Sequence, residues 1–310
     1  MDIKPKVLLV DDEERILRSL GLLLRMQYQV FATSDGHEAL AILRREKIHV
    51  LISDQRMPVM SGSELLRQAR EVSPDTVRIL LTGYADADAA LASVNEGEIF
   101  RYITKPWGPK ELRDTIAQAA EIAVRLEGAT LAPALPAAHG RLTCLVLDRD
   151  EATFQAVQDV IGAHHDVLWR QTVTGALQVL ASQPVAILVT ELSLGDEDLS
   201  AMIKQLKQER PELLTLILTC FKDTSRLVDL INQAQVFRYL PKPVRKGLLG
   251  RSIESTIARY QAMSTRPALL ATQAVEKTRD VGELQAGSKV AEYLARLRGK
   301  TGRPQPQPAG

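Results

Sequence analysis

One segment of the sequence occurs twice, and this repeat constrains the fold more than any other feature. The sequence FRYITKP at residues 100–106 returns as FRYLPKP at residues 237–243, an offset of 137 residues. The same offset relates three further pairs of residues: Thr82 and Thr219, Asp11 and Asp148, Asp54 and Glu191. One offset shared by four motifs predicts a duplicated domain.

Apolar runs of strand length alternate with amphipathic segments five times between residues 5 and 126. The predicted strands are 6–10, 29–32, 50–52, 77–81 and 99–103, and the predicted helices are 13–26, 38–46, 63–71, 86–96 and 109–126. This alternation is typical of an α/β fold with a parallel sheet. We expect two tandem flavodoxin-like (βα)5 domains with five-stranded sheets, the first strand at the centre of its sheet, and Asp12 capping the first helix.

Breaks in the periodic pattern divide the chain into four parts. Residues 1–126 form the first predicted domain, and residues 127–140 are an Ala/Pro-rich, semi-stiff linker. The second copy covers residues 141–262. The tail, residues 263–310, is expected to be mostly disordered, and a short helix over 288–299 is the alternative for part of it.

Polar side chains stand where the predicted strands of the first copy end. Asp54 ends the apolar run 50–52, Asp11 and Asp12 end the first run, and Thr82 and Lys105 follow the last two. A lone Asp at such a position is more often a turn residue or a helix cap. Carboxyl ends of parallel strands meet at one edge, however, so we expect all five groups to converge there.

The converging groups predict phosphoryl chemistry. Three close carboxylates repel one another unless a cation lies among them, and Mg²⁺ prefers oxygen ligands. Lys105 supplies a point charge for phosphoryl oxygens, and Thr82 supplies a hydroxyl. Asp54 is then an anionic nucleophile.

These motifs resemble the receiver domains of two-component response regulators. The matching segments are residues 10–13 (VDDE), 53–58 (SDQRMP), 81–83 (LTG) and 105–106 (KP), in order and at fitting spacing. The resemblance implies that Asp54 is the phosphoacceptor and that Asp12, Asp54 and the carbonyl of Arg56 bind Mg²⁺, while Asp11 acts through a metal-bound water. It also implies that Thr82 and Tyr102 are the switch pair.

The second copy differs at the positions that matter for this chemistry. The offset places Arg149 where the first copy has Asp12, Glu191 where it has Asp54, and Gly195 where it has Pro58. We expect Arg149 to pair with Glu191 in place of a metal and this copy to have lost phosphotransfer. Two interpretations of Glu191 stay open: that it imitates a phosphorylated residue, or, as we favour, that the site drifted while selection maintained a dimerisation or docking surface. The Asp148–Asp150 pair also resembles haloacid-dehalogenase-like phosphatases, but Ala152 stands where that family has Thr.

Composition narrows the location and the partners. The net charge of +1 provides no field toward nucleic acid or membrane, and no apolar run approaches the length of a spanning helix. The two cysteines, Cys144 and Cys220, lie in apolar runs without metal-ligand spacing. We therefore expect a cytoplasmic protein that binds neither DNA nor membrane.

The predicted function is that of a non-enzymatic response regulator without its own effector domain. A histidine kinase or histidine phosphotransfer protein would pass a phosphoryl group to Asp54, and Thr82 and Tyr102 would reshape the face made by the fourth helix, last strand and last helix. That face would bind a downstream protein, and a homodimer stays open. The alternative functions are a phosphate sink or scaffold in a phosphorelay and, less favoured, a phosphatase.

Overall fold

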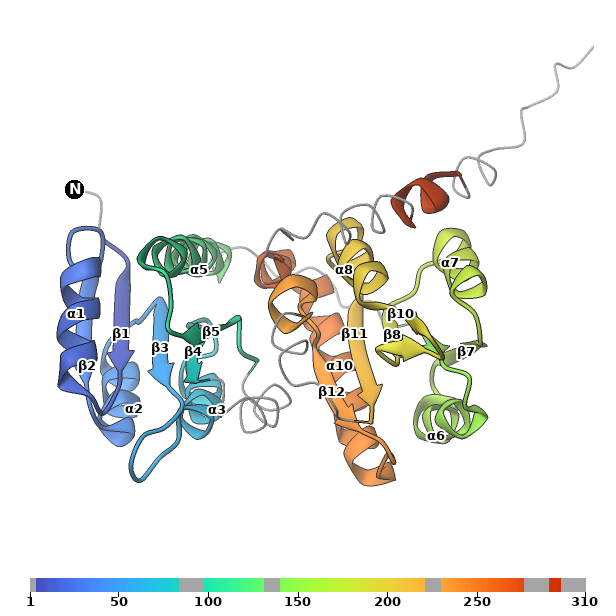
Figure 1. Cartoon of the computed structure of the whole chain (residues 1–310), viewed down its shortest axis with the longest axis horizontal. Helices are drawn as coiled ribbons and strands as arrows, with labels where there is room; N and C mark the ends of the chain where they lie inside the picture. The colour runs from blue at the N-terminus through green and yellow to red at the C-terminus, as the bar shows by residue number, and fades with distance from the viewer. Residues whose placement is uncertain (1–3, 84–97, 131–139, 221–229, 276–289, 297–310) are drawn as a thin grey trace, which may run out of the picture. The chain divides into compact units, whose positions relative to one another are not determined.

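The computed structural model describes residues 4–83, 98–130, 140–220, 230–275 and 290–296 (Figure 1). The chain forms two compact units. The first comprises Met1–Ala138, Phe221–Tyr239 and Gln261–Ala274, and the second comprises His139–Cys220, Leu240–Tyr260 and Val275–Gly310. In the part of the chain described, no helix combines the length and apolar content needed to cross a bilayer.

The first sheet has five parallel strands in the order β2-β1-β3-β4-β5. Their bounds are β1 Lys6–Val10, β2 Gln29–Thr33, β3 Val50–Asp54, β4 Val77–Gly83 and β5 Arg101–Lys105. The predicted flavodoxin-like sheet is thus confirmed. The expectation that the first strand is central was wrong, because β3 is the middle strand and β1 lies beside it. The strand that ends at Asp54 therefore has two neighbours on each side.

Four described helices belong to this sheet: α1 Glu14–Leu24, α2 Gly36–Arg45, α3 Gly62–Val72 and α5 Pro109–Thr130. Side chains cap two of them, since Asp35 accepts from the N–H of Glu38 and Ser61 accepts from the N–H of Glu64. The predicted cap at Asp12 was wrong, because Glu13 is the N-cap of α1 and makes no side-chain cap bond. The predicted helix 86–96 lies outside the described residues.

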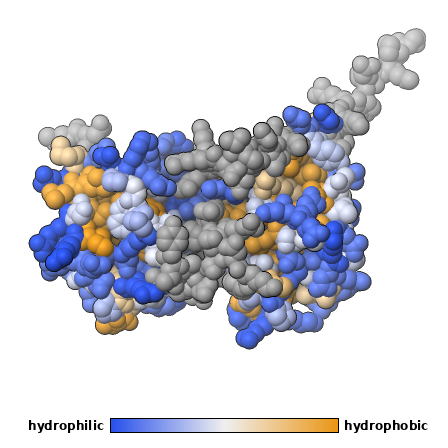
Figure 2. All heavy atoms as spheres, in the orientation of Figure 1, coloured by the Kyte–Doolittle hydropathy of each residue, from blue (hydrophilic) through white to orange (hydrophobic). Residues whose placement is uncertain are grey.

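Apolar side chains from both faces of the sheet fill the core. β1 and β3 are almost wholly buried, and on one face they pack with α5 through Leu112, Ile116 and Ala119. α5 runs one turn past the predicted end near residue 126, into the segment expected to be linker. Figure 2 shows polar side chains over most of the described surface in that view, with smaller apolar patches between them.

The second sheet repeats the first, with strand order β12-β11-β8-β6-β7 and the same parallel pairing (Figure 1). Its strands are β6 Thr143–Leu147, β7 Asp166–Arg170, β8 Ile187–Thr190, β11 Leu214–Thr219 and β12 Arg238–Pro241. The helices are α6 Glu151–Ile161, α7 Val173–Ser182, α8 Ser200–Glu209 and α10 Lys246–Thr265. A small hairpin, β9 Ser193–Leu194 and β10 Glu197–Asp198, follows β8.

A short 3₁₀ helix, η2 Pro267–Gln273, follows α10, and residues 290–296 are helical. η2 stands at the start of the predicted tail, where sequence analysis expected little order. The remaining parts of the predicted tail helix and of the tail lie outside the described residues.

Candidate functional site at the carboxyl edge of the first sheet

Asp54 is the last residue of β3 and lies at the middle of the sheet edge. It is 5% exposed, and its Oδ2 accepts a hydrogen bond from the backbone N–H of Arg56 at 2.7 Å. Its Oδ1 lies 2.5 Å from Nζ of Lys105. One oxygen is therefore held by the loop that follows β3, and the other by a cation from β5.

Lys105 joins two carboxylates. Its Nζ, besides contacting Asp54, lies 3.4 Å from Oδ2 of Asp11. Burial by itself would lower the pKa of Lys105, but the hydrogen bonds and charges of Asp54 and Asp11 outweigh it and raise the pKa above its usual value. Burial raises the pKa of Asp11, although the N–H of Glu13 and the charge of Lys105 act against that rise.

The three predicted metal carboxylates are gathered only in part. Asp11 is 2% exposed and its Oδ1 accepts from the N–H of Glu13 at 2.9 Å, whereas Asp12, its chain neighbour, is exposed. Among the described residues, no three His, Cys, Asp or Glu side chains cluster closely enough to hold a metal ion. The structure thus brings Asp11, Asp54 and Lys105 together and leaves Asp12 at the rim.

The donor set fits a hard cation. Asp11 and Asp54 offer buried carboxylate oxygens, and the backbone at Arg56 is already tied to Asp54. Two carboxylates against the single charge of Lys105 leave a net negative edge, which favours a divalent ion with oxygen ligands. Asp12 at the same strand end can add a carboxylate to such an ion directly or through water.

The predicted switch residues stand on neighbouring strands. Thr82 of β4 is 1% exposed, and its hydroxyl donates to the carbonyl of Gly83 at 3.3 Å. Tyr102 of β5 is 2% exposed, so its ring belongs to the interior in this conformation. The strand register places Tyr102 level with Leu80 and Ser53, one residue before the level of Asp54, and Thr82 one residue beyond that level.

Sequence analysis missed the role of Gly62. The sequence does not distinguish this glycine from an ordinary turn residue, but α3 begins here directly against Asp54. A Cβ on Gly62 would lie 2.0 Å from the backbone oxygen of Asp54, closer than any side chain can approach. The N–H of Gly62 also donates to the carbonyl of Gln55 at 3.1 Å, which fixes this approach.

Asn232 was missed as well. Its side-chain amide bonds both backbone groups of Tyr102: the Tyr102 N–H donates to Oδ1 at 2.9 Å, and Nδ2 donates to the Tyr102 carbonyl at 2.7 Å. The internal repeat could have drawn attention to this residue, because Asn232 and Asn95 are identical residues related by the offset of 137.

The corresponding edge of the second sheet is closed by ion pairs. Nζ of Lys242 lies 2.6 Å from Oδ2 of Asp148 and 2.9 Å from Oε2 of Glu191. As with Lys105, burial alone would lower the pKa of Lys242, and the two carboxylates raise it. The expected pair between Arg149 and Glu191 was wrong, because Glu191 bonds Lys242 instead.

Arg149 lies beside the loop after β8. Its guanidinium would stand 2.5 Å from a Cβ built on Gly195, whose φ of +71° suits glycine. Asp150, the neighbouring carboxylate, accepts from the N–H of Ala152 and caps α6. Arg149, at the position of Asp12, thus lies against the loop after β8, and Asp150 caps the N-terminus of α6.

Comparison with known proteins agrees with this geometry. Residues 7–117 match the family model described as the response regulator receiver domain. The hydrogenase transcriptional regulatory protein HoxA of Cupriavidus necator is 43% identical over 120 residues, covering 39% of this chain and 25% of HoxA. The transcriptional regulatory protein GlrR of Escherichia coli K12 is 37% identical over 123 residues, covering 39% of this chain and 28% of GlrR.

Among solved structures, the signal receiver domain of an HD domain-containing protein from Pseudomonas fluorescens Pf-5 is 36% identical, covers 41% of this chain and 95% of that chain, and has a TM-score of 0.40. The chain spans about a quarter of the length of the two curated relatives above. Residues 7–117 are therefore a receiver domain of the kind found in two-component response regulators, and a second five-stranded sheet of corresponding strand order follows it in the chain.

Proposed function

We propose that the protein accepts one phosphoryl group on Asp54 from a histidine kinase or a histidine phosphotransfer protein, and that this switches a protein-binding surface of the first unit. The observation that carries the proposal is the position of Asp54. Asp54 is the carboxylate that ends the central strand β3, and Lys105 holds one of its oxygens at 2.5 Å.

The transfer step follows from these positions. An Asp54 oxygen attacks the phosphorus of a phosphohistidine, a P–O bond forms, the P–N bond breaks, and the imidazole leaves with the bonding electron pair and takes a proton from water. Lys105 stays within reach of both the carboxylate and the arriving phosphoryl oxygens. Its positive charge reduces the electrostatic repulsion between these two anionic groups. The N–H of Arg56 holds the other Asp54 oxygen during the attack.

Mg²⁺ is the proposed cofactor, held by Asp11, Asp12, Asp54 and the carbonyl of Arg56. It supplies the positive charge that balances phosphoryl oxygens during transfer. Asp11 contributes a buried oxygen that is already oriented by the N–H of Glu13. Displacing Lys105 from Asp11 toward the phosphoryl group would leave Asp11 free for the ion.

The acyl phosphate is expected to act through Thr82 and Tyr102. Thr82 shares the sheet edge with Asp54, and its hydroxyl can turn from the Gly83 carbonyl to a phosphoryl oxygen. Movement of Thr82 makes room beside β5, where Tyr102 is buried. We propose that the resulting change is read by a protein partner rather than by DNA, and that the chain takes one phosphoryl group instead of turning over a phosphoester.

The second sheet is proposed to be a receiver that no longer accepts phosphate. Lys242 bridges Asp148 and Glu191, and Arg149 replaces one of the carboxylates that hold the ion. A fixed cation at that position repels Mg²⁺. Glu191 is also one methylene longer than Asp, so its carboxylate stands further from the backbone that would orient it.

Intact mass measured after incubation with acetyl phosphate and Mg²⁺ tests the proposal. The wild-type chain should gain one phosphoryl group, Asp54→Ala should gain none, and Glu191→Ala should gain one. Asp11→Asn should gain less at the same donor concentration. Addition of a phosphoryl group to Asp54→Ala at the wild-type level would refute the assignment, and two additions to the wild type would refute the degenerate second site.

A further inference from the structure

β5 is the last strand of the first sheet, so one of its long edges faces no other strand of that sheet. Such an edge presents unpaired N–H and C=O groups. Here two side-chain amides from the C-terminal half of the sequence cover them. Asn232 bonds both backbone groups of Tyr102 at 2.9 and 2.7 Å, and Nε2 of Gln235 donates to the carbonyl of Phe100 at 3.0 Å.

This pairing imitates a neighbouring strand. A primary amide carries one donor and one acceptor on the same plane, as a peptide group does. Asn232 therefore satisfies the N–H and C=O of one residue together, which an ordinary surface side chain rarely does. Asn232 lies in the helical turn over residues 230–234, and Gln235 follows that turn with a φ of +45°. Their amides reach Tyr102 of β5 and Phe100, the residue just before β5.

Arg101, between the two contacted residues, is held by a second segment. It is 0% exposed, and its guanidinium lies 4.1 Å from the centre of the Phe100 ring. Its Nη2 donates to the carbonyl of Ala274 at 2.7 Å, directly after η2. A fully buried guanidinium needs such acceptors, so the end of this segment completes the surroundings of β5.

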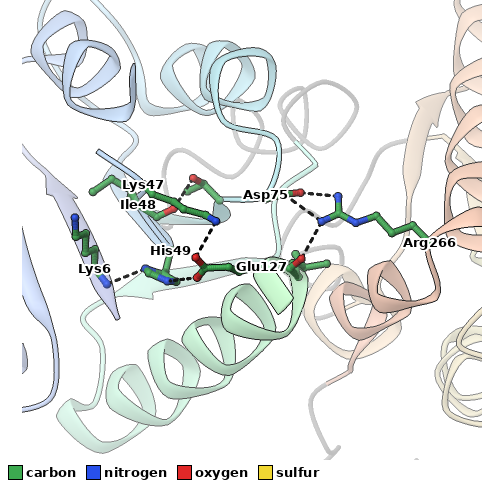
Figure 3. A network of polar contacts seen from close by, with 9 residues as sticks. Lys6, Lys47, Ile48, His49, Asp75, Glu127 and Arg266 are labelled. Atoms are coloured by element: carbon green, nitrogen blue, oxygen red, sulfur yellow. Dashed lines mark hydrogen bonds and ion pairs between the residues drawn. The ribbon is translucent and has the colours of Figure 1, made fainter. Parts of the chain in front are cut away.

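The other end of the segment is fixed by Arg266 (Figure 3). Its guanidinium donates to both carboxylate oxygens of Asp75, at 2.8 and 3.2 Å, and to the carbonyl of Leu126 in α5 at 2.9 Å. Between the two anchors, Ala268, Leu269 and Ala271 pack against the core of the first unit. We call residues 266–274 the strap.

We propose that Asn232, Gln235 and the strap are the resting partner of the β5 edge, and that phosphorylation of Asp54 weakens their hold. The inference rests on the proposed function, because it assigns an occupant to the surface that the switch is expected to change. The contacts concentrate on Phe100, which precedes β5, and on Arg101 and Tyr102, the first two residues of β5, of which Tyr102 belongs to the proposed switch. The protein that this surface would bind therefore competes with segments of the same chain.

Linkage makes the coupling reciprocal. If the segments bind the resting form of β5 better than the phosphorylated form, removing their contacts must favour phosphorylation by the same factor. An occupant that only completes the fold would have equal affinity for both forms and would shift nothing.

Hydrogen exchange of the full chain, read by mass spectrometry with and without acetyl phosphate and Mg²⁺, tests the inference without any substitution. The peptides to follow cover residues 99–104, 230–235 and 266–274, and intact mass is measured on the same samples. We expect exchange in all three to rise at least several-fold on phosphorylation, while Asp54→Ala shows no change. A phosphorylated wild type whose three peptides exchange as before would overturn the inference and leave the proposed function standing. Absence of a phosphoryl group would remove both.

Two substitutions test reciprocity. Asn232→Asp keeps the acceptor for the Tyr102 N–H and loses the donor to its carbonyl, and Arg266→Lys keeps the charge and loses the two-point contact with Asp75. Each should raise the fraction of Asp54 phosphorylated at a limiting donor concentration by about twofold to tenfold, in line with typical coupling energies. Arg18→Lys, in an exposed pair with Glu14 on α1, is the matched control and should change nothing. An unchanged fraction in both test variants would contradict the proposal.

Discussion

The two sheets each hold one lysine between two carboxylates at the same edge, but the two groups differ in shape and in surrounding charge. In the first, Lys105 lies 2.5 Å from Asp54 and 3.4 Å from Asp11, an uneven contact. In the second, Lys242 lies 2.6 Å from Asp148 and 2.9 Å from Glu191, nearly central. Lys105 therefore contacts Asp54, the proposed acceptor, more closely than Asp11, the proposed metal ligand, whereas Lys242 contacts both of its carboxylates closely.

The neighbouring residues sharpen this difference. Next to Asp11 stands a carboxylate, Asp12, which adds to the negative edge, and next to Asp148 stands a cation, Arg149. The loop after the central strand also diverges, because the second copy forms a hairpin of β9 and β10 there. A site that must admit a divalent cation needs spare negative charge. Asp12 adds such charge beside Asp11, whereas Arg149 reduces it beside Asp148.

The largest expected effect comes from removing each lysine. Lys105→Met leaves the buried carboxylates of Asp11 and Asp54 without their cation, and Lys242→Met does the same to buried Asp148 and partly exposed Glu191. The free energy of unfolding should fall by about 3–5 kcal/mol in Lys105→Met and by less in Lys242→Met. Added Mg²⁺ should restore most of that loss in Lys105→Met, because the ion replaces the missing charge, and should restore none in Lys242→Met.

Urea unfolding followed by tryptophan fluorescence measures this contrast. Trp107 lies in the first unit and Trp169 in the second, so a Trp169→Phe background reports on Lys105→Met and a Trp107→Phe background reports on Lys242→Met. Rescue of both variants by Mg²⁺ would show that the two edges do not differ in metal binding.

Gly62 gives the next largest effect. Gly62→Ala places a methyl group against the backbone of Asp54, and the first unit should lose about 1–3 kcal/mol of unfolding free energy. Uptake of phosphate should fall as well, since α3 and Asp54 must move apart. The offset places Leu199, buried at 1% exposure, at this position of the second copy, so the close approach is particular to the first edge.

Gly21→Ala is the control for Gly62. Gly21 lies within α1 with nothing within 4 Å of a new Cβ, so the change should stabilise the first unit by about 0.5–1 kcal/mol. Equal losses in both variants would mean that the contact with Asp54 is not the cause.

Much of this fold could be predicted from the sequence, because buried parallel strands are visible as apolar runs and polar residues follow the ends of these runs. Asp54, Asp11 and Lys105 were found in that way, and the repeat located the second edge. The partner of Glu191 was mispredicted because Arg149 and Lys242 are both cations that follow or end strands at the same end of the second sheet, and only the direction of each side chain decides between them. Spacing along the chain contains no such direction.

Contacts between distant segments escaped prediction for a related reason. Asn232 and Tyr102 are 130 residues apart, and Arg266 and Asp75 are 191 residues apart. No periodic pattern links such residues, and a short 3₁₀ segment such as η2 has too few turns to show one. The residues that hold β5 therefore became visible only in three dimensions.

A third test asks whether the second edge can be repaired. Arg149→Asp with Glu191→Asp restores the two carboxylates of the first copy and keeps Asp148, Lys242 and Thr219. Intact mass after acetyl phosphate treatment should show a second phosphoryl group on a minority of chains. Glu191→Asp alone should show none, because Arg149 still repels the ion. A double variant that stays folded and gains nothing would assign the loss of function to the β9–β10 loop instead.

The smallest effect concerns Lys207, a buried lysine in α8 of the second unit, and the corresponding residue of the first. Lys207 in α8 is 2% exposed, and burial lowers its pKa to about 7, while the offset relates it to Arg70, which is half-buried and 3.5 Å from Glu98. Its folded-state pKa lies below the unfolded value of 10.5, so above pH 7 the unfolded chain binds more protons and stability rises with pH until about 10.5. Between pH 7 and 8 the free energy of unfolding of the second unit should rise by about 1 kcal/mol, measured by urea unfolding of Trp107→Phe.

Lys207→Met should remove this pH-dependent rise. A gain that persists in Lys207→Met would assign the pH dependence to another group, and the first unit, measured in Trp169→Phe, should show no comparable rise.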